Sequence, residues 1–372
     1  MDDHDQRMVI ARERLARQGL TGPAKGSAAA VVRALGAVQA QEFVPAQWAL
    51  ALRLRPGATL RDTLCAHDRG RILRTHVLRP TWHFVSPRDI RWMLELSAPQ
   101  VHRAMAPYDR RLGLDPPLLT RAAGVVERAL GEEGFLTRAE LGERLGRAGI
   151  AASSWRLGHM MLWIELESVV TSGPRRGAQH TYALLADRAP GAPRLPRDEA
   201  LGELARRYFT SHGPATVQDF MWWSGLKAPD ARRAMDIARP RRTEVDGRAY
   251  WMVGRAPRAV RRARAFLLPI YDEYTVAYRH RGAVPAGPAM ARSPRGGYVR
   301  FQHAVVIDGQ VAGTWRTAPR PGGGAVDVVP LRRLTREEAR AVALAVRRYE
   351  CFIGQPGGGM RQSALSARLA MR

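Results

Sequence analysis

Two glutamines, Gln39 and Gln41, are the residues of this chain whose type and spacing most directly suggest a chemical site. They lie in the stretch "RALGAVQAQEFVPAQWAL", in which Gly36 can end one helix and Pro45 can begin the next. Side chains two residues apart share one face of an extended segment, whereas in a helix they diverge by about 200°. We therefore expect "AVQAQEFV" to be extended, with both carboxamides pointing the same way. Taken alone, the pair could contact adenine edges, bind phosphates or act in catalysis.

The charge of the chain indicates the kind of partner. It has 372 residues, enough for two or more domains, with a formal net charge of +25 and a pI of about 11.4. Binding to phosphates releases condensed counterions, so nucleic acid is the first candidate partner and an anionic membrane surface the second. Nearly all of the basic residues are arginine, with Lys25 and Lys227 the only lysines. A GC-rich genome would also produce that bias, but arginine's planar fork suits phosphates and guanine edges.

The rest of the composition excludes several classes of protein. Cys65 and Cys351 lie far apart without metal-ligand spacing, so we expect no zinc module, no metal and no secreted disulfide scaffold. The charged N-terminus lacks a signal-peptide core, and no apolar run approaches the ~20 residues of a membrane span, which favours a soluble cytoplasmic protein. Without a deaminase signature or a phosphate-binding glycine loop, we expect no cofactor.

The elements that must position the glutamines are short helices followed by strands. Helical spacing is found in "MVIARERLARQGL", in "SAAAVVRALG" with Ser27 as its cap, and in "PAQWALALRL" and "TLRDTLCAHDRG". The segment "RILRTHVLRPTWHFV" then predicts two short strands, broken near Arg79 and Pro80. Helices followed by a β-ribbon have the order of a winged helix, which we assign to residues 1–115.

The same order of elements recurs twice. Residues 116–190 predict a long helix, a shorter helix with a capping box, a third helix and a ribbon whose tip is "SGPRRGAQ". After a proline-rich linker, residues 197–258 predict another helical set and a hairpin that turns at Asp246 and Gly247. Residues 263–372 are strand-rich and close with a helix. The predicted fold class is α+β, with three tandem winged helix-turn-helix units and a C-terminal strand-rich segment.

Basic residues gather at the predicted ribbons, where a winged helix meets duplex DNA. Any one of them could be an ordinary solvated side chain, but the whole set is not expected by chance. The candidate DNA contacts are Arg74, His76 and Arg79 in the first ribbon, Arg175, Arg176 and His180 in the second, Arg241 and Arg242 before the third, and Arg279, His280 and Arg281 in the tail.

The Gln-Ala-Gln motif, followed in order by "PTWHFVSPRDIRWML", "LLPIYDEYTVAYRHR" and "VVIDGQVAGTWR", resembles the AlkZ/YcaQ family of winged-helix DNA glycosylases over nearly the whole chain. The resemblance implies three winged helices that form a concave DNA-binding surface in a monomer. A Gln-aliphatic-Gln motif marks the AlkZ-like branch, whereas the YcaQ-like branch has Asp at the second position, so Gln41 places this chain nearer AlkZ. Members of that branch remove bulky N7-alkylated purines, including interstrand crosslinks, and protect antibiotic producers. Ala40 between the glutamines is small but apolar.

The resemblance gives the two glutamines a catalytic role. Alkylation at N7 makes guanine cationic, so the base leaves without a strong acid, and a carboxamide can stabilise the oxocarbenium-like sugar and place a water at C1′. We expect Gln39 and Gln41 to share this task and unmodified purines to be cut slowly or not at all. A Schiff-base lyase needs an amine. Because both lysines lie in other segments, we expect a monofunctional glycosylase that leaves an abasic site. A bulky base also fits an open cleft better than the pocket of a base-flipping enzyme.

Five other residues have both a structural and a functional interpretation. Trp155, Trp222 and Trp223 could stack on bases, but large aromatics at helical spacing are more often core, which is what we expect here. Asp272 and Glu273 could assist water activation, but we favour a structural role in which they brace the first domain.

Two other functions fit the same composition. A non-enzymatic winged-helix regulator would bind undamaged DNA with sequence specificity, usually as a dimer on a palindrome. A basic architectural protein would bend or coat DNA, and replacing Gln39 would then change nothing measurable. Weak, salt-sensitive and sequence-tolerant binding favours the glycosylase.

Overall fold

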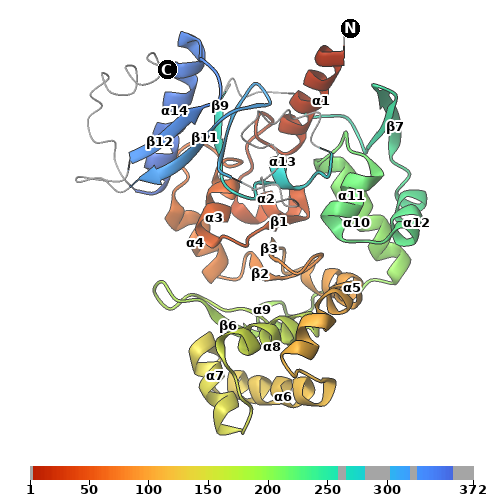
Figure 1. Cartoon of the computed structure of the whole chain (residues 1–372), viewed down its shortest axis with the longest axis vertical. Helices are drawn as coiled ribbons and strands as arrows, with labels where there is room; N and C mark the ends of the chain where they lie inside the picture. The colour runs from red at the N-terminus through yellow and green to blue at the C-terminus, as the bar shows by residue number, and fades with distance from the viewer. Residues whose placement is uncertain (1–2, 259–264, 281–301, 319–324, 355–372) are drawn as a thin grey trace.

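The computed structural model describes residues 3–258, 265–280, 302–318 and 325–354. In these ranges the chain forms four small antiparallel sheets separated by helices (Figure 1). This arrangement confirms the α+β fold class. No helix among the described residues is long and apolar enough to cross a membrane.

The first sheet, with strand order β1-β3-β2, carries the glutamine motif. Its middle strand places His83 opposite Gln39. Ser27 caps the preceding helix by accepting from the backbone of Ala30, and Gly36 ends that helix at φ +83°, as expected. The elements are α1 (Asp3–Arg17), α2 (Ala28–Leu35), β1 (Ala37–Gln39), α3 (Phe43–Ala51), α4 (Leu60–Asp68), β2 (Leu73–His76) and β3 (Trp82–Val85).

The extended segment is shorter than we expected. Strand β1 ends at Gln39, Gln41 lies in a bend, and α3 already begins at Phe43, so Pro45 is the third residue of that helix rather than its start. A proline is tolerated there because the first backbone N–H groups of a helix have no partner within the helix. Only the first glutamine therefore belongs to the strand.

The second set of elements has a core of its own. Leu119, Val126, Leu141, Met160 and Ile164 are among its buried residues. It follows the long helix α5 (Ile90–Arg111), whose buried residues belong to another core, and consists of α6 (Pro116–Glu133), β4 (Phe135–Thr137), α7 (Arg138–Arg147), α8 (Ser154–Leu166), β5 (Val170–Ser172), β6 (Thr181–Leu184) and α9 (Leu185–Arg188). The capping box of α7 is present as predicted, between Thr137 and Glu140. The short strand β4, which joins the ribbon to form a three-stranded sheet, was not predicted.

The third set carries the predicted Asp-Gly hairpin turn, and the C-terminal set has another of the same kind. Asp246 and Gly247 both have positive φ, as do Asp308 and Gly309, and this is the backbone that two-residue hairpins require. The third set is α10 (Arg197–Ser211), α11 (Val217–Ser224), α12 (Ala228–Ala238), β7 (Arg241–Val245) and β8 (Arg248–Met252). The C-terminal set is β9 (Ala265–Leu268), α13 (Glu273–Val276), β10 (Ala304–Ile307), β11 (Gln310–Ala318), β12 (Ala325–Pro330) and α14 (Arg336–Phe352).

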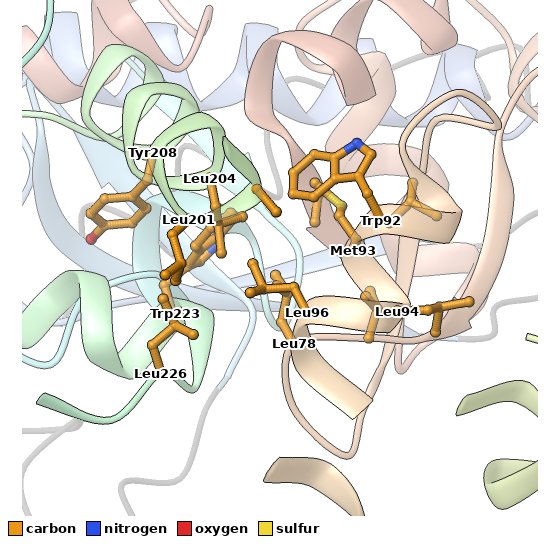
Figure 2. Packing of buried hydrophobic residues seen from close by; sticks show 14 of the residues in the cluster. Leu78, Trp92, Met93, Leu94, Leu96, Leu201, Leu204, Tyr208, Trp223 and Leu226 are labelled. Atoms are coloured by element: carbon orange, nitrogen blue, oxygen red, sulfur yellow. The ribbon is translucent and has the colours of Figure 1, made fainter. Parts of the chain in front are cut away.

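The hydrophobic cores join these sets into one assembly. Figure 2 shows Trp92 and Leu96 of α5 facing Leu201 of α10 and Trp223 of α11, with Leu78 between them. Another core packs the C-terminal sheet and α14 against buried residues of the first set, such as Trp48. A further core lies within the first set itself. The order of helices and strands is consistent with tandem winged helices, but their side chains pack across the predicted boundaries. The Gln39 strand therefore lies where several sets meet.

Candidate active site

The backbone of Gln39 is fixed from the far end of the chain. Its N–H donates to Glu273 Oε1 at 2.8 Å, across 234 residues. Glu273 is fully buried, and its Oε2 accepts from Trp223 Nε1 at 3.0 Å and faces His212 Nε2 at 3.3 Å. Burial alone would raise the pKa of Glu273, but the contacts with His212 and Gln39 lower it overall. The carboxylate therefore stays charged and holds β1 in place, which agrees with the expected bracing role.

Asp272, the neighbour of Glu273, makes an internal ion pair. Its two carboxylate oxygens accept from the guanidinium of Arg53 at 2.8 and 2.9 Å, and both side chains are buried. Asp272 also caps α13 by accepting from the backbone of Tyr274. Both acidic residues of this pair thus serve as structural supports.

The side chain of Gln39 is fixed by an arginine. Gln39 is only 7% exposed, and its Oε1 accepts from Arg79 Nη2 at 3.0 Å. The same nitrogen lies 3.3 Å from His83 Nε2. His83 Nδ1 lies 2.9 Å from the carbonyl oxygen of Thr81, so Nδ1 carries the hydrogen and Nε2 presents its lone pair to Arg79. Burial and the charge of Arg79 lower the pKa of His83 to about 3, and the ring is neutral at physiological pH.

Gln41 is held from the neighbouring strand. Its Oε1 accepts from the backbone N–H of Trp82 at 3.3 Å, and Ala40 N donates to Trp82 O at 2.7 Å. Arg74 donates to the carbonyl oxygens of Ala40 and Gln41 at 2.9 and 3.2 Å, and its guanidinium lies 4.2 Å from the centroid of the Trp82 ring. Arg74 was predicted to contact DNA. Two of its nitrogens, Nε and Nη2, instead bind the backbone of the motif.

A second buried glutamate supports the strand pair from the other side. Glu165 of α8 accepts from the backbone of His76 at 2.7 Å and lies 2.8 Å from its ring Nδ1. It also accepts from Thr75 Oγ1 at 3.2 Å and Trp82 Nε1 at 3.4 Å. His76 is 6% exposed and occupied by this contact, so the expectation that it faces DNA is contradicted. Glu165 links the second set of elements to the motif.

The predicted contacts of the second ribbon are partly internal. Arg175 makes a bidentate ion pair with Asp68, in which Nη2 lies 2.8 Å from Oδ2 and Nε lies 3.1 Å from Oδ1. This ion pair attaches the ribbon tip to the end of α4. The ring of His180 packs edge-on against Phe43 at 4.4 Å, and burial lowers its pKa to about 4. Arg176 is exposed and paired with Glu140 at 2.5 Å. Of these three residues, Arg176 and His180 are exposed, whereas Arg175 is half-buried.

The remaining candidates differ in accessibility. Arg241 and Arg242 belong to strand β7 rather than preceding it, and Arg242 is exposed beside Glu244 at 3.0 Å. Arg279 is exposed, and the backbone of His280 donates to Asp219 at 2.8 Å. Arg281 lies outside the described residues. Of the predicted basic residues that the structure describes, Arg74 and Arg79 hydrogen-bond to the glutamine motif.

Trp155, Trp222 and Trp223 differ in how exposed their side chains are. Trp223 is buried, as expected. Trp222 is 40% exposed and donates through Nε1 to the carbonyl oxygen of Val276 at 2.8 Å. Trp155, the second residue of α8, is 78% exposed, so its assignment to the core was wrong. Helical spacing alone does not tell which helix face another element covers.

Sequence reasoning identified the glutamines and the bracing role of Glu273, but it did not identify two other supports, Glu165 and Arg79. Glu165 carries no motif, and Arg79 was expected to contact DNA rather than Gln39. Both are long-range or loop contacts for which spacing in the sequence gives no signal. Among the described residues no group of three or more His, Cys, Asp and Glu side chains could hold a metal ion.

Comparisons with known proteins agree on the family. Residues 32–352 match the family model described as DNA glycosylase AlkZ-like. The chain is 28% identical over 328 residues to an interstrand DNA cross-link repair glycosylase of Streptomyces sahachiroi, covering 81% of this chain and 85% of that protein. Its fold is similar to that of the Streptomyces sahachiroi DNA glycosylase AlkZ, with a TM-score of 0.75 and 24% identity over 94% of this chain and 96% of the other. Because the family match spans most of its length and includes both glutamines, this chain belongs to the AlkZ-like family and is a DNA glycosylase.

Proposed function

We propose that this enzyme hydrolyses the N-glycosidic bond of bulky N7-alkylated purines in duplex DNA. The observation that carries the proposal is a pair of neutral carboxamides, Gln39 and Gln41, held in fixed orientations by the surrounding protein. No carboxylate or amine of the described residues hydrogen-bonds to either side-chain amide. A site of this kind suits a substrate that needs no strong acid.

The chemistry follows from the charge of the lesion. An N7-alkylguanine is cationic, and it becomes neutral as it leaves, while positive charge develops on the deoxyribose. A carbonyl oxygen has two lone pairs. In Gln39 one of them accepts from Arg79, which leaves the other for a water or for the developing charge at C1′. Because a carboxamide is a poor base, unmodified purines, which leave as anions, are released slowly or not at all.

The product of the proposed reaction is an abasic site with an intact backbone. A lyase step needs an amine that attacks C1′. Lys25 precedes α2, and Lys227 is the N-cap of α12. Neither belongs to the strands that carry or face the glutamines, so hydrolysis by water is the proposed route.

The choice of lesion is the finer part of the proposal. The Streptomyces relative is named for the repair of interstrand cross-links. We extend that substrate class to this chain, together with bulky monoadducts formed by genotoxins against which a producer protects itself. The proposed units are winged helices at 1–115, 116–190 and 197–258, with a C-terminal region at 263–372. We propose that the protein acts as a monomer and that these units place the exposed Arg176, Arg242 and Arg279 against DNA.

Base release from duplex DNA tests the proposal. Oligonucleotides that carry one small or one bulky N7-alkylguanine are incubated with wild type, Gln39→Ala, Gln41→Ala and, as matched control, Gln218→Ala. Gln218 is an exposed glutamine of α11. We expect release by wild type and the control, and a rate at least about 10²-fold lower in the two motif variants, with DNA binding retained.

Two results would count against the proposal. Release that is unaffected by both motif substitutions would place the chemistry elsewhere. No release from either adduct, with tight and sequence-specific binding to undamaged DNA, would favour the regulator.

A further inference from the structure

Arg79 is the described residue that donates to the carboxamide oxygen of Gln39. A guanidinium carries a positive charge and only donors, with no acceptor. Its partner on Gln39 must therefore be Oε1, and Nε2 must lie on the opposite side of the amide. A reversed carboxamide would place N–H groups against N–H groups. Arg79 thus dictates which end of the Gln39 amide faces away from the protein.

The loop that carries Arg79 is held more tightly than an ordinary turn. Leu78 has φ +65°, a conformation that is rare for a bulky side chain and persists only when its surroundings impose it. Its backbone N–H donates to Ser97 Oγ at 3.0 Å, and its carbonyl oxygen accepts from Gln100 Nε2 at 3.4 Å. Gly225, at the end of α11, lies so close that a Cβ there would be 2.4 Å from the same carbonyl oxygen. Two helices therefore fix the position of the loop.

Desolvating the charge of Arg79 costs free energy unless the guanidinium makes compensating contacts. Burial lowers the pKa of its guanidinium, and the negative charge of Glu273 opposes this shift. Its Nη1 makes a long contact of 3.5 Å with the carbonyl oxygen of Trp222, and its Nε is buried without a partner among the described residues. Arg79 is half-buried as a whole, but its buried Nε and its contact with Gln39 Oε1 point to an internal task rather than to a simple phosphate contact.

We propose that Arg79 is a positioning residue for base excision, which sets the orientation of the Gln39 carboxamide. Glu273 holds the backbone of Gln39, and Arg79 holds its side chain, so that opposite charges fix the residue at both ends. The second lone pair of Oε1 then points in one direction before DNA arrives. The catalytic consequence rests on the proposed function, whereas the contact itself does not.

A double-mutant cycle tests the catalytic consequence. Single-turnover release and DNA affinity are measured for Arg79→Met, Gln39→Ala and the double variant, with Arg88→Met as the control that removes an exposed arginine from the same set of elements. We expect Arg79→Met to lower the rate by about 30- to 100-fold and the affinity by less than about threefold. The double variant should be no slower than Gln39→Ala, because the two residues act as a unit. Arg79→Lys should recover part of the rate.

Multiplicative losses in the double variant would overturn the proposal. So would a loss of affinity equal to the loss of rate, which would make Arg79 a DNA contact. Thermal unfolding of each variant shows whether it is folded, and Arg79→Lys replaces Arg79→Met in the cycle if the latter is not.

An NMR titration that requires no catalytic activity tests this inference independently of the proposed function. Gln39→Glu, labelled with δ-¹³C-glutamate, adds one carboxyl signal to the NMR spectrum. The pKa of that carboxyl is measured with Arg79 intact and again in combination with Arg79→Met and with Arg79→Lys. An adjacent cation stabilises the carboxylate, so we expect the pKa to be at least about one unit lower with Arg79 intact than in combination with Arg79→Met.

Equal pKa values in these backgrounds would show that residues 39 and 79 are not in contact, which would overturn the inference. If wild type releases no base, the proposed function fails, while this titration still decides the role of Arg79.

Discussion

The backbone of Gln39 donates to the buried carboxylate of Glu273 at 2.8 Å, although 234 residues separate them in the sequence. This contact ties strand β1, which carries Gln39 of the proposed site, to the C-terminal set of elements. A carboxylate is well suited to this position because it can accept from Gln39 and Trp223 together, without a donor of its own.

Replacement of Glu273 by glutamine should therefore damage both stability and catalysis. The new amide group must point an N–H at the backbone N–H of Gln39 or at Trp223 Nε1, so we expect a loss of about 2–4 kcal/mol in the free energy of unfolding. A shift of β1 should lower the single-turnover rate by about 10²-fold. Denaturant unfolding and base release measure the two effects. Glu127→Gln, at an exposed position of α6, is the control that should change neither. A stable, fully active Glu273→Gln would contradict the bracing role.

Gly225→Ala should disturb the active site from outside it. Gly225 has φ +72°, and an added Cβ would lie 2.4 Å from the carbonyl oxygen of Leu78, which precedes Arg79. Gly134→Ala is a matched control, since Gly134 ends α6 at φ +77° with open space around its Cβ. Both variants should lose about 1–2 kcal/mol through the strained backbone, but only Gly225→Ala should also lose at least tenfold in rate. Equal rates for the two variants would show that the Arg79 loop tolerates displacement.

Buried neutral histidines should make the fold sensitive to acid. Burial and the nearby Arg79 lower the pKa of His83 to about 3, and burial lowers that of His67 to about 4. Because these values lie below the ~6.5 of a free histidine, the stabilisation is fully present above about pH 6.5 and is lost as the pH falls toward the folded-state pKa. Between pH 6.5 and 5, His83 alone should account for up to about 2 kcal/mol.

His83→Gln provides the test of that pH dependence. A glutamine can still accept from Arg79 and donate to Thr81, but it does not titrate. Unfolding free energies at pH 7 and pH 5 should differ less in this variant than in wild type. An unchanged difference would mean that His83 is already protonated or exposed in the folded protein.

Arg279 offers a test of the proposed DNA surface. Its side chain is exposed, unlike that of Arg74, which is committed to the motif backbone. If Arg279 contacts a phosphate, Arg279→Ala should weaken binding about equally for all sequences and reduce the slope of log affinity against log salt by about one. Fluorescence anisotropy over a range of salt concentrations measures both quantities. A change in affinity that depends on sequence, with the salt slope unchanged, would rule out a phosphate contact.

The sequence was most informative where a local rule applies. The cap at Ser27, the capping box at Thr137 and the hairpin turn at Asp246 each depend on hydrogen bonds or backbone angles within four residues, and each was predicted correctly. The glutamine motif was found in the same way, as two like residues in a short segment.

Other features could not be obtained from local rules. The burial of His76 depends on Glu165 from another set of elements, and the exposure of Trp155 depends on which face of α8 is covered. Arg79 could be recognised as basic and close to a turn, but its partner Gln39 lies 40 residues away. These contacts follow from how the sets pack together, for which a single sequence carries no pattern.

The positions of Glu165 and Glu273 in the sequence have a consequence for the synthesis and folding of the enzyme. Residues 1–115 contain both glutamines of the proposed site, yet Glu165 and Glu273 are synthesised later. While the nascent chain leaves the ribosome, its first segment carries the reactive motif without either support. Such a fragment, released early by a premature stop or by a protease, would be a poor catalyst on chromosomal DNA. If the glutamines act as proposed, we expect base excision to require that both glutamates have been synthesised and that the chain has folded around them.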